Sequence, residues 1–174
     1  MNRRIGKKMV QVISILFCLG FMVSAAHAAG TQIVSLSPAA VKGETVAITI
    51  LYDVSGAAGK TTGIGIRIHY DSHVFSLAVF EELYGDGLIG ADLVAQNDVK
   101  DLDDDPSTDK YLVVAWMGVQ GDWPSFLPLP LTLGKVSLKI KPEAATTVTQ
   151  VNVTSAGNAS GYQFQGKAAA VRIH

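Results

Sequence analysis

Residues 63–77, with the sequence GIGIRIHYDSHVFSL, place the strongest constraint on the fold. From residue 63 to 70, large apolar residues alternate with small or polar ones, and this period of two is typical of a β-strand that buries one face. Asp71 and Ser72 interrupt the alternation, because their side chains compete for backbone hydrogen bonds and favour turns. An apolar run resumes at residue 74. The segment therefore predicts two strands joined by a sharp turn.

Other segments also have the pattern of strands. Residues 45–52 alternate, and residues 131–140 alternate with a phase slip at Gly134-Lys135 that predicts a bulge. Residues 111–117, YLVVAWM, are apolar on both faces and predict a central strand that is covered on both sides. Shorter strands are expected at residues 32–36, 147–153, 162–164 and 168–173. Short strands separated by turn residues predict an all-β fold in which two sheets face each other.

Helical signals are weak. Residues 81–93 could hold a turn of helix, but three glycines in this segment argue against a long one.

The first 28 residues have the pattern of a secretory signal peptide. Four basic residues precede an apolar run at residues 9–23, and Ala26-His27-Ala28 supplies the small residues that a signal peptidase recognises. The apolar run is shorter than the ~20 residues that a transmembrane helix needs. We therefore expect cleavage after Ala28 and one secreted domain at residues 29–174, in the periplasm or outside the cell, with no further transmembrane segment.

Loss of the leader would change the charge balance. The chain has 14 basic and 15 acidic residues, and the leader holds four of the basic ones and none of the acidic ones, so the remainder has a formal net charge of −5. This acidic character argues against a nucleic-acid partner. The single cysteine, Cys18, lies in the leader, so we expect no disulfide.

The order of motifs along the mature chain supports a family resemblance. A Lys42-Gly43-Glu44 turn precedes a Val/Ile strand, GIGIRIHYDS follows, and LGKVSLKIK begins at residue 133, before a short final strand. Over about residues 31–173, this pattern resembles the cohesin domain. The resemblance implies an antiparallel two-sheet β-sandwich with jelly-roll topology and about nine strands. It also implies a non-catalytic module that binds a dockerin-like protein in extracellular assemblies related to polysaccharide.

An acidic segment at residues 97–109 is the best candidate for metal chemistry. Calcium takes six to eight oxygen ligands, and carboxylates at alternate positions can supply them. The candidate ligands are Asp101, Asp103, Asp105 and Asp109. Pro106 follows where an EF-hand needs a glycine turn, so the segment is not an EF-hand. The alternative is a solvated loop whose charges keep a sheet edge soluble.

Aromatic residues in loops are candidates for contact with a ligand, because sugar rings stack on exposed aromatic faces. Trp123 and Phe126 lie in a GDWPSF loop between predicted strands, and Tyr84 lies in another loop. The alternative is that Trp123 and Phe126 fold back and close one end of the sandwich. Trp116 lies within the apolar YLVVAWM run and is expected in the core.

Catalysis has little support in the sequence. The chain has no G-x-S-x-G nucleophile elbow and no cysteine in its mature part. His69 and His73 are four residues apart, a spacing that aligns side chains on a helix but not across a strand and a turn, so a zinc pair is not expected. Three functions stay open: recognition of a dockerin-like protein, direct binding of polysaccharide, and a structural surface or matrix subunit whose sheet edges add strands between molecules.

Overall fold

The computed structural model describes residues 30–42, 44–56, 60–125 and 127–174. The predicted signal peptide and Phe126 lie outside the described residues, so the predictions for them stay predictions. Within the described part, no helix is both long enough and apolar enough to cross a membrane.

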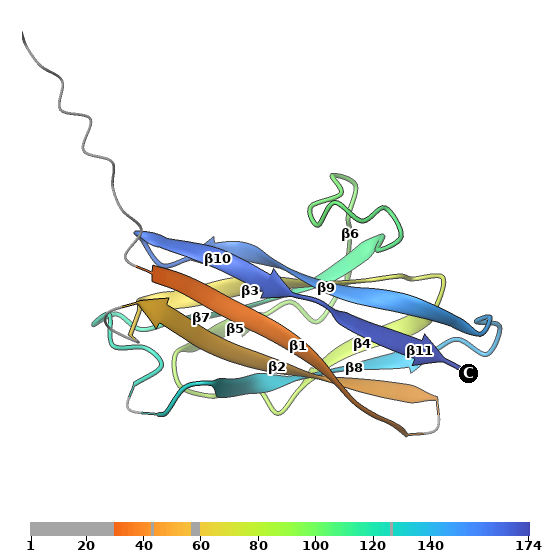
Figure 1. The fold of residues 1–174 in the computed structure, drawn as a ribbon, viewed down its shortest axis with the longest axis horizontal. Coiled ribbons are helices and arrows are strands. Elements are labelled where there is room, and N and C mark those ends of the chain that lie inside the picture. Colours follow the sequence, from red (N-terminus) through yellow and green to blue (C-terminus); the bar gives the residue numbers. More distant parts are fainter. Residues whose placement is uncertain (1–29, 43, 57–59, 126) are drawn as a thin grey trace, which may run out of the picture.

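Eleven strands form the described part of the chain (Figure 1). They are β1 (Gly30–Lys42), β2 (Thr45–Gly56), β3 (Gly63–Tyr70), β4 (Phe75–Glu81), β5 (Leu88–Ala91), β6 (Gln96–Asn97), β7 (Lys110–Met117), β8 (Leu131–Ile140), β9 (Thr147–Asn158), β10 (Tyr162–Lys167) and β11 (Ala169–Ile173). The nine strands expected from the sequence are all present. The two additional ones, β5 and β6, are short edge segments that form by pairing with β7 and show little alternation of their own.

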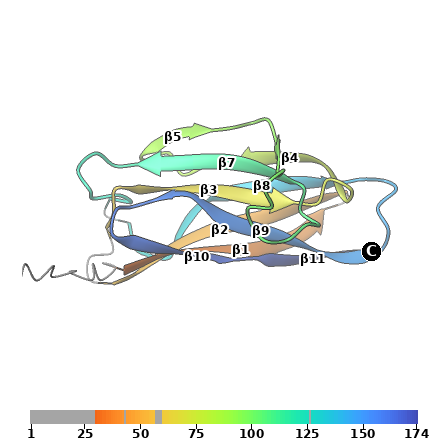
Figure 2. The same cartoon turned by 90° about the horizontal axis from the view of Figure 1, so that it is seen from above.

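The strands build two sheets, which confirms the predicted all-β sandwich. One sheet has the order β10-β1-β2-β8-β4, and the other has the order β11-β9-β3-β7-β5, with β6 also paired to β7. Figure 2 shows β5, β7, β3 and β9 following one another from one edge of the molecule. Most pairs are antiparallel as expected, but β1 pairs with β10 in parallel. The jelly-roll topology stays a prediction.

The alternating sequence of β3 buries one face of the strand, as predicted. Ile64, Ile66, Ile68 and Tyr70 are buried in the core between the sheets. Burial of each such side chain stabilises the fold by about 1.5–3 kcal/mol relative to exposure. The strand ends at the predicted turn, where the carbonyl of Asp71 accepts hydrogen bonds from the N–H groups of Val74 and Phe75 at 3.2 and 3.0 Å.

The predicted bulge in β8 is also present. The register between β2 and β8 shifts after Ile50, opposite Gly134. Gly134 has a φ of 145°, a backbone conformation that residues other than glycine rarely adopt. An added Cβ would lie 2.9 Å from Leu83 Cδ2. The slip in the sequence pattern therefore marks a real change of pairing.

One prediction for β7 is wrong in part. This strand is central, and Leu112, Val114 and Trp116 face the core as its apolar sequence suggests. Its other face was expected to be covered, but it points outward, and Met117 there is 49% exposed. A continuous apolar run predicts two apolar faces, but it does not reveal whether a second layer of chain covers both.

Candidate functional site

The outer face of the sheet formed by β9, β3, β7 and β5 changes character along β3. The outward positions of β3 are Gly63, Gly65, Arg67 and His69, so the strand begins with small residues and ends with basic ones. The two ends of this face form different surfaces. One is an open apolar groove, and the other is a buried polar cluster beneath the acidic loop.

The groove has a floor of small residues that crosses four strands. Ala115 on β7 pairs with Gly65 on β3 and with Gly90 on β5, and Gly65 pairs in turn with Gly157 on β9. An added Cβ at Gly90 or at Gly157 would find no heavy atom within 4 Å, so the space above the floor is open. The floor therefore runs across the strands rather than along one of them.

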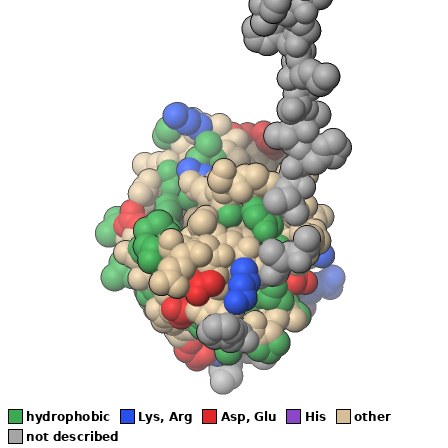
Figure 3. Space-filling model, turned by 90° about the vertical axis from the view of Figure 1, so that its left-hand side faces the viewer, with side chains coloured by type: hydrophobic (Ala, Val, Ile, Leu, Met, Phe, Trp, Pro, Cys, Tyr) green, Lys and Arg blue, Asp and Glu red, His purple; other side chains and the backbone are tan. Residues whose placement is uncertain are grey.

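Larger apolar side chains border this floor, and together they form an open hollow of about 380 Å³. The bordering residues include Val113, Met117 and Ile89, and the side chain of Ile89 is 61% exposed. The groove lies towards the end of the sandwich where β3 begins and β7 ends. Figure 3 shows that end, with hydrophobic side chains gathered along one side of it. An exposed apolar surface of this kind marks an interaction site in many soluble proteins. We call it the apolar groove.

At the other end of β3, the loop of residues 98–109 folds over the sheet. The loop is closed at its base by a hydrogen bond from the Asp98 N–H to the Asp109 carbonyl, at 2.8 Å. It reaches across β3 to β9, where the amide of Asn152 donates to Asp103 Oδ2 and Asp105 Oδ2 at 2.9 and 3.0 Å. Because the loop covers it, the outward-facing His69 is completely buried.

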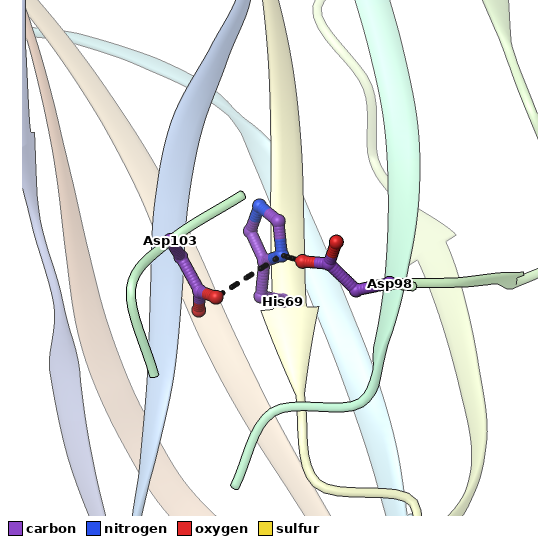
Figure 4. A group of neighbouring side chains, drawn as sticks. All are labelled: His69, Asp98 and Asp103. Carbon is purple, nitrogen blue, oxygen red and sulfur yellow. Dashed lines mark ion pairs between the residues drawn. The ribbon is translucent and has the colours of Figure 1, made fainter. Parts of the chain in front are cut away.

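His69 lies between two buried carboxylates (Figure 4). Its Nδ1 is 2.9 Å from Asp98 Oδ2 and 3.8 Å from Asp103 Oδ1, and the two aspartate side chains are 1% and 2% exposed. The closer of these contacts is an ion pair when the ring is protonated. Among the described residues, neither His69 Nδ1 nor Asp103 Oδ1 has a hydrogen-bond partner. We call these three residues the His69 cluster.

Neighbouring side chains hold the His69 cluster in place. Nε2 of His69 is 2.8 Å from the hydroxyl of Thr154 on β9, which orients the ring. Asp103 Oδ2 accepts from the Thr108 hydroxyl at 2.5 Å as well as from Asn152. The unpartnered atoms therefore belong to side chains that are held firmly at their other atoms.

Burial lowers the pKa of His69 below its ordinary value, although the negative charges of Asp103 and Asp98 partly oppose this shift. The imidazole is therefore neutral at pH 7. In a neutral imidazole, one nitrogen carries a proton and the other has a free lone pair. Nδ1 can offer its lone pair to a cation only in the tautomer whose proton is on Nε2, where the Thr154 hydroxyl can accept it.

The four aspartates predicted as calcium ligands do not converge on one point. Among the described residues, Asp103 belongs to the His69 cluster, and Asp109 lies with Asp71 and His73. Both oxygens of Asp109 accept hydrogen bonds from Ser72 at 2.7 Å. Asp105 accepts from Ser107, and Asp101 is exposed. Calcium binding stays a prediction, without a shared set of these four ligands.

The predicted aromatic surface is not formed by Trp123. Its side chain is 1% exposed, it packs against Tyr52 and Trp116 at ring distances of 4.8 and 6.3 Å, and its Nε1 donates to the Asp86 carbonyl. The residue closes the end of the sandwich, which is the alternative that the sequence left open. Tyr84 is half-buried, and its hydroxyl contacts Asp86 and the Pro124 carbonyl at 3.3 Å.

Two features of this face were not found by sequence reasoning. Asp98 belongs to the acidic segment, but its spacing gave no reason to pair it with His69, which is 29 positions earlier. The glycine and alanine floor is spread over four strands. In the sequence, each strand shows only that some of its outward positions hold small residues. That these positions lie side by side is known only once the register between the strands is known.

Comparison with known proteins finds similarity of fold only. No model of a protein family and no curated protein matches the chain. The fold is similar to a cohesin module from a family 33 glycoside hydrolase of Clostridium perfringens, with 15% identity and a TM-score of 0.46, covering 83% of this chain and 96% of that one. It is also similar to a chain of a type I cohesin–dockerin complex from Clostridium thermocellum, with 9% identity and a TM-score of 0.45, covering 79% of this chain and 96% of that one.

Proposed function

We propose that the chain is an exported, non-catalytic module that binds a dockerin-like protein partner in the apolar groove. The observation that carries the proposal is the open floor of small residues bordered by exposed aliphatic side chains. Burial of this surface by a partner would contribute about 25 cal/mol per Å² of apolar area removed from water. The leader pattern and the cohesin-like order of motifs, read from the sequence, support the same proposal.

The dimensions of the groove suit a helix of the partner. Val113 and Met117 border the groove and are four residues apart on β7. Four residues of extended chain span about 13 Å. An α-helix with its side chains is about 10–12 Å wide, so a helix can lie across the strands between these two residues. Small residues beneath it would allow close approach of the helix backbone.

Direct binding of polysaccharide has less support. Trp123, the strongest candidate for a sugar platform, is buried, and the Tyr84 hydroxyl is engaged by neighbouring groups. The groove is lined mainly by small and aliphatic residues, its aromatic lining residue Trp116 is 2% exposed, and few polar groups line it. A sugar needs polar partners for its hydroxyl groups, whereas an apolar helix face does not.

Isothermal titration with purified dockerin modules tests the proposal. We expect binding by the wild-type protein and at least tenfold weaker binding by Ile89→Asp, because an acidic group at the border of the groove would be desolvated by the partner. Leu77→Asp is the matched control, since Leu77 is 54% exposed on the other sheet and its substitution should leave the affinity unchanged.

Two further measurements separate the alternatives. Binding on a glycan array with no dockerin binding would contradict the proposal and favour a polysaccharide-binding module. Concentration-dependent assembly in sedimentation velocity, with neither ligand bound, would favour a structural subunit. Equal loss of affinity in Ile89→Asp and Leu77→Asp would contradict the location of the binding surface.

A further inference from the structure

We propose that the His69 cluster is a binding site for a divalent transition metal of the zinc type. The ligands are Nδ1 of His69 and one carboxylate oxygen each from Asp98 and Asp103 (Figure 4). This site shares Asp103 with the calcium ligands predicted from the sequence but differs from them in its other two ligands, and it does not depend on the apolar groove.

Two buried polar atoms of the His69 cluster have no partner. His69 Nδ1 and Asp103 Oδ1 lack hydrogen-bond partners among the described residues, although both are removed from water. Buried polar groups without partners are rare in folded proteins, and each such group requires an explanation. A cation placed between a ring nitrogen and two carboxylates would satisfy all three at once.

The distances between the ligand atoms suit a zinc ion. A tetrahedral zinc ion with bonds of about 2.1 Å requires its ligand atoms to lie about 3.4 Å apart. The distances from His69 Nδ1 to the two carboxylate oxygens, 2.9 and 3.8 Å, lie on either side of this value. All three ligand atoms lie within 4.8 Å of one another. Small side-chain adjustments would bring them to a common distance from one ion.

The residues around the ligands hold them as the neighbours of metal ligands usually do. Metal-binding histidines usually use their second nitrogen for a hydrogen bond that fixes the ring, and ligating carboxylates are themselves hydrogen-bonded. Thr154 occupies that position at His69 Nε2, while Thr108 and Asn152 hold the second oxygen of Asp103. Among the described residues, His69 Nδ1 and Asp103 Oδ1 are left without a partner, whereas Asp98 Oδ2 also accepts from the Leu102 N–H at 3.1 Å.

The ligand types select the metal. Calcium prefers six to eight oxygen ligands, so a compact group with an imidazole nitrogen suits it poorly. Zinc accepts nitrogen and carboxylate ligands in four-coordinate sites, and three protein ligands leave one position for water. A hollow of about 230 Å³ lies next to this site and is lined by Asp98 together with residues that include Arg67 and Tyr111.

The test is isothermal titration of the EDTA-treated, dialysed protein with Zn²⁺ and, separately, with Ca²⁺. We expect one zinc ion per chain. Asp103→Asn should weaken binding by at least a hundredfold, whereas Asp104→Asn should not change it. Asp104 is an exposed neighbour with a φ of 58°, which asparagine tolerates. Likewise His69→Gln should abolish binding, while His73→Gln, at an exposed histidine, should retain it.

A spectroscopic measurement keeps the test decisive if His69→Gln fails to fold. Co²⁺ bound in place of zinc should give the visible absorption of a four-coordinate ion, and Thr154→Val should weaken its binding by about 10–100-fold, because the ring loses its orienting partner. At a free Zn²⁺ concentration about 100 times Kd, the melting temperature should rise by about 5–10 °C. No stoichiometric zinc binding, equal binding by Asp103→Asn and Asp104→Asn, or a preference for Ca²⁺ would each overturn the proposal.

Discussion

The outward side of β3 is open to solvent at one end of the strand and buried at the other. At the groove end, Gly65 lies at the bottom of an open hollow bordered by exposed aliphatic side chains. At the loop end, four residues later on the same side of the same strand, His69 is completely buried. The strand geometry is the same in both places. The difference comes from the loop of residues 98–109, which covers one end and leaves the other open.

This contrast shows that the outer face of a sheet takes its character from what lies over it. An apolar floor without a cover offers a surface to another molecule. A polar floor beneath an acidic loop becomes a buried group of titratable side chains, in which charge and hydrogen bonding must be balanced inside the protein. One strand thus supports two different candidate functions.

The largest effect is expected beneath the groove end, where Trp123 closes the core. Trp123→Ala should lower the free energy of unfolding by about 3–5 kcal/mol, because the indole fills space beside Tyr52 and Trp116. Urea denaturation measures this change. Val119→Ala is the control, since Val119 is 90% exposed in the same loop, and its effect should stay within about 0.5 kcal/mol. Similar losses in both variants would show that Trp123 does not support the core.

A smaller loss is expected at the loop end. Asn152→Ala removes the amide that donates to both Asp103 and Asp105, so it should lower the free energy of unfolding by about 2 kcal/mol. The measurement is made with EDTA present, so that metal binding does not contribute. Gln150→Ala, at an exposed position on the same face of β9, should change stability by less than about 0.5 kcal/mol. If Asn152→Ala is equally harmless, the loop is not held down by this contact.

Alanine substitutions at two glycines of the groove should change stability in opposite directions. Gly157→Ala should raise the free energy of unfolding by about 0.4–1 kcal/mol, because the new methyl group meets open space and alanine restricts the unfolded chain. Gly63→Ala should instead destabilise, since its Cβ would lie 2.1 Å from the Trp116 carbonyl oxygen at a φ of 127°. Thermal melting distinguishes the two. Destabilisation by Gly157→Ala would show that the groove is not open at β9.

The smallest effect concerns pH at the base of the acidic loop. Burial acts to raise the pKa of Asp109, but hydrogen bonds from Ser72 outweigh it, so the pKa lies below its usual value. A lowered pKa in the folded state adds stability above the unfolded-state pKa of about 3.9, and this stability is lost as pH falls through the folded-state pKa.

Urea unfolding at pH 7 and pH 3 measures this contribution. Between pH 7 and pH 3, the free energy of unfolding should fall by about 0.5 kcal/mol less in Ser72→Ala than in the wild-type protein. The difference is small because Asp109 is partly exposed to solvent. Ser76→Ala, which removes a hydroxyl that donates to the Lys139 carbonyl instead, should keep the pH dependence of the wild-type protein. An unchanged dependence in Ser72→Ala would contradict a role for this pair.

Much of the fold was predictable because strands with one buried face carry a local signal. The bounds of β3 and β8, the turn at Asp71 and the bulge at Gly134 all follow from alternation and its interruption. The candidate site was predictable only in pieces. Asp103 and the apolar outer side of β7 were noticed, but Asp98 was not joined to His69. Trp123 was a candidate for ligand contact, and the alternative that it closes the end of the sandwich is the one observed.

The pattern of side chains along the chain was enough to establish which face of each strand points into the core, because period-two alternation is a property of neighbouring residues. It could not establish what covers the opposite face. That depends on where a loop lands after the strands have paired, as when residues 98–109 reach from β7 across β3 to Asn152 on β9. Contacts between residues 29 to 49 positions apart leave no periodic trace, so the open groove and the buried His69 cluster became visible only in the folded chain.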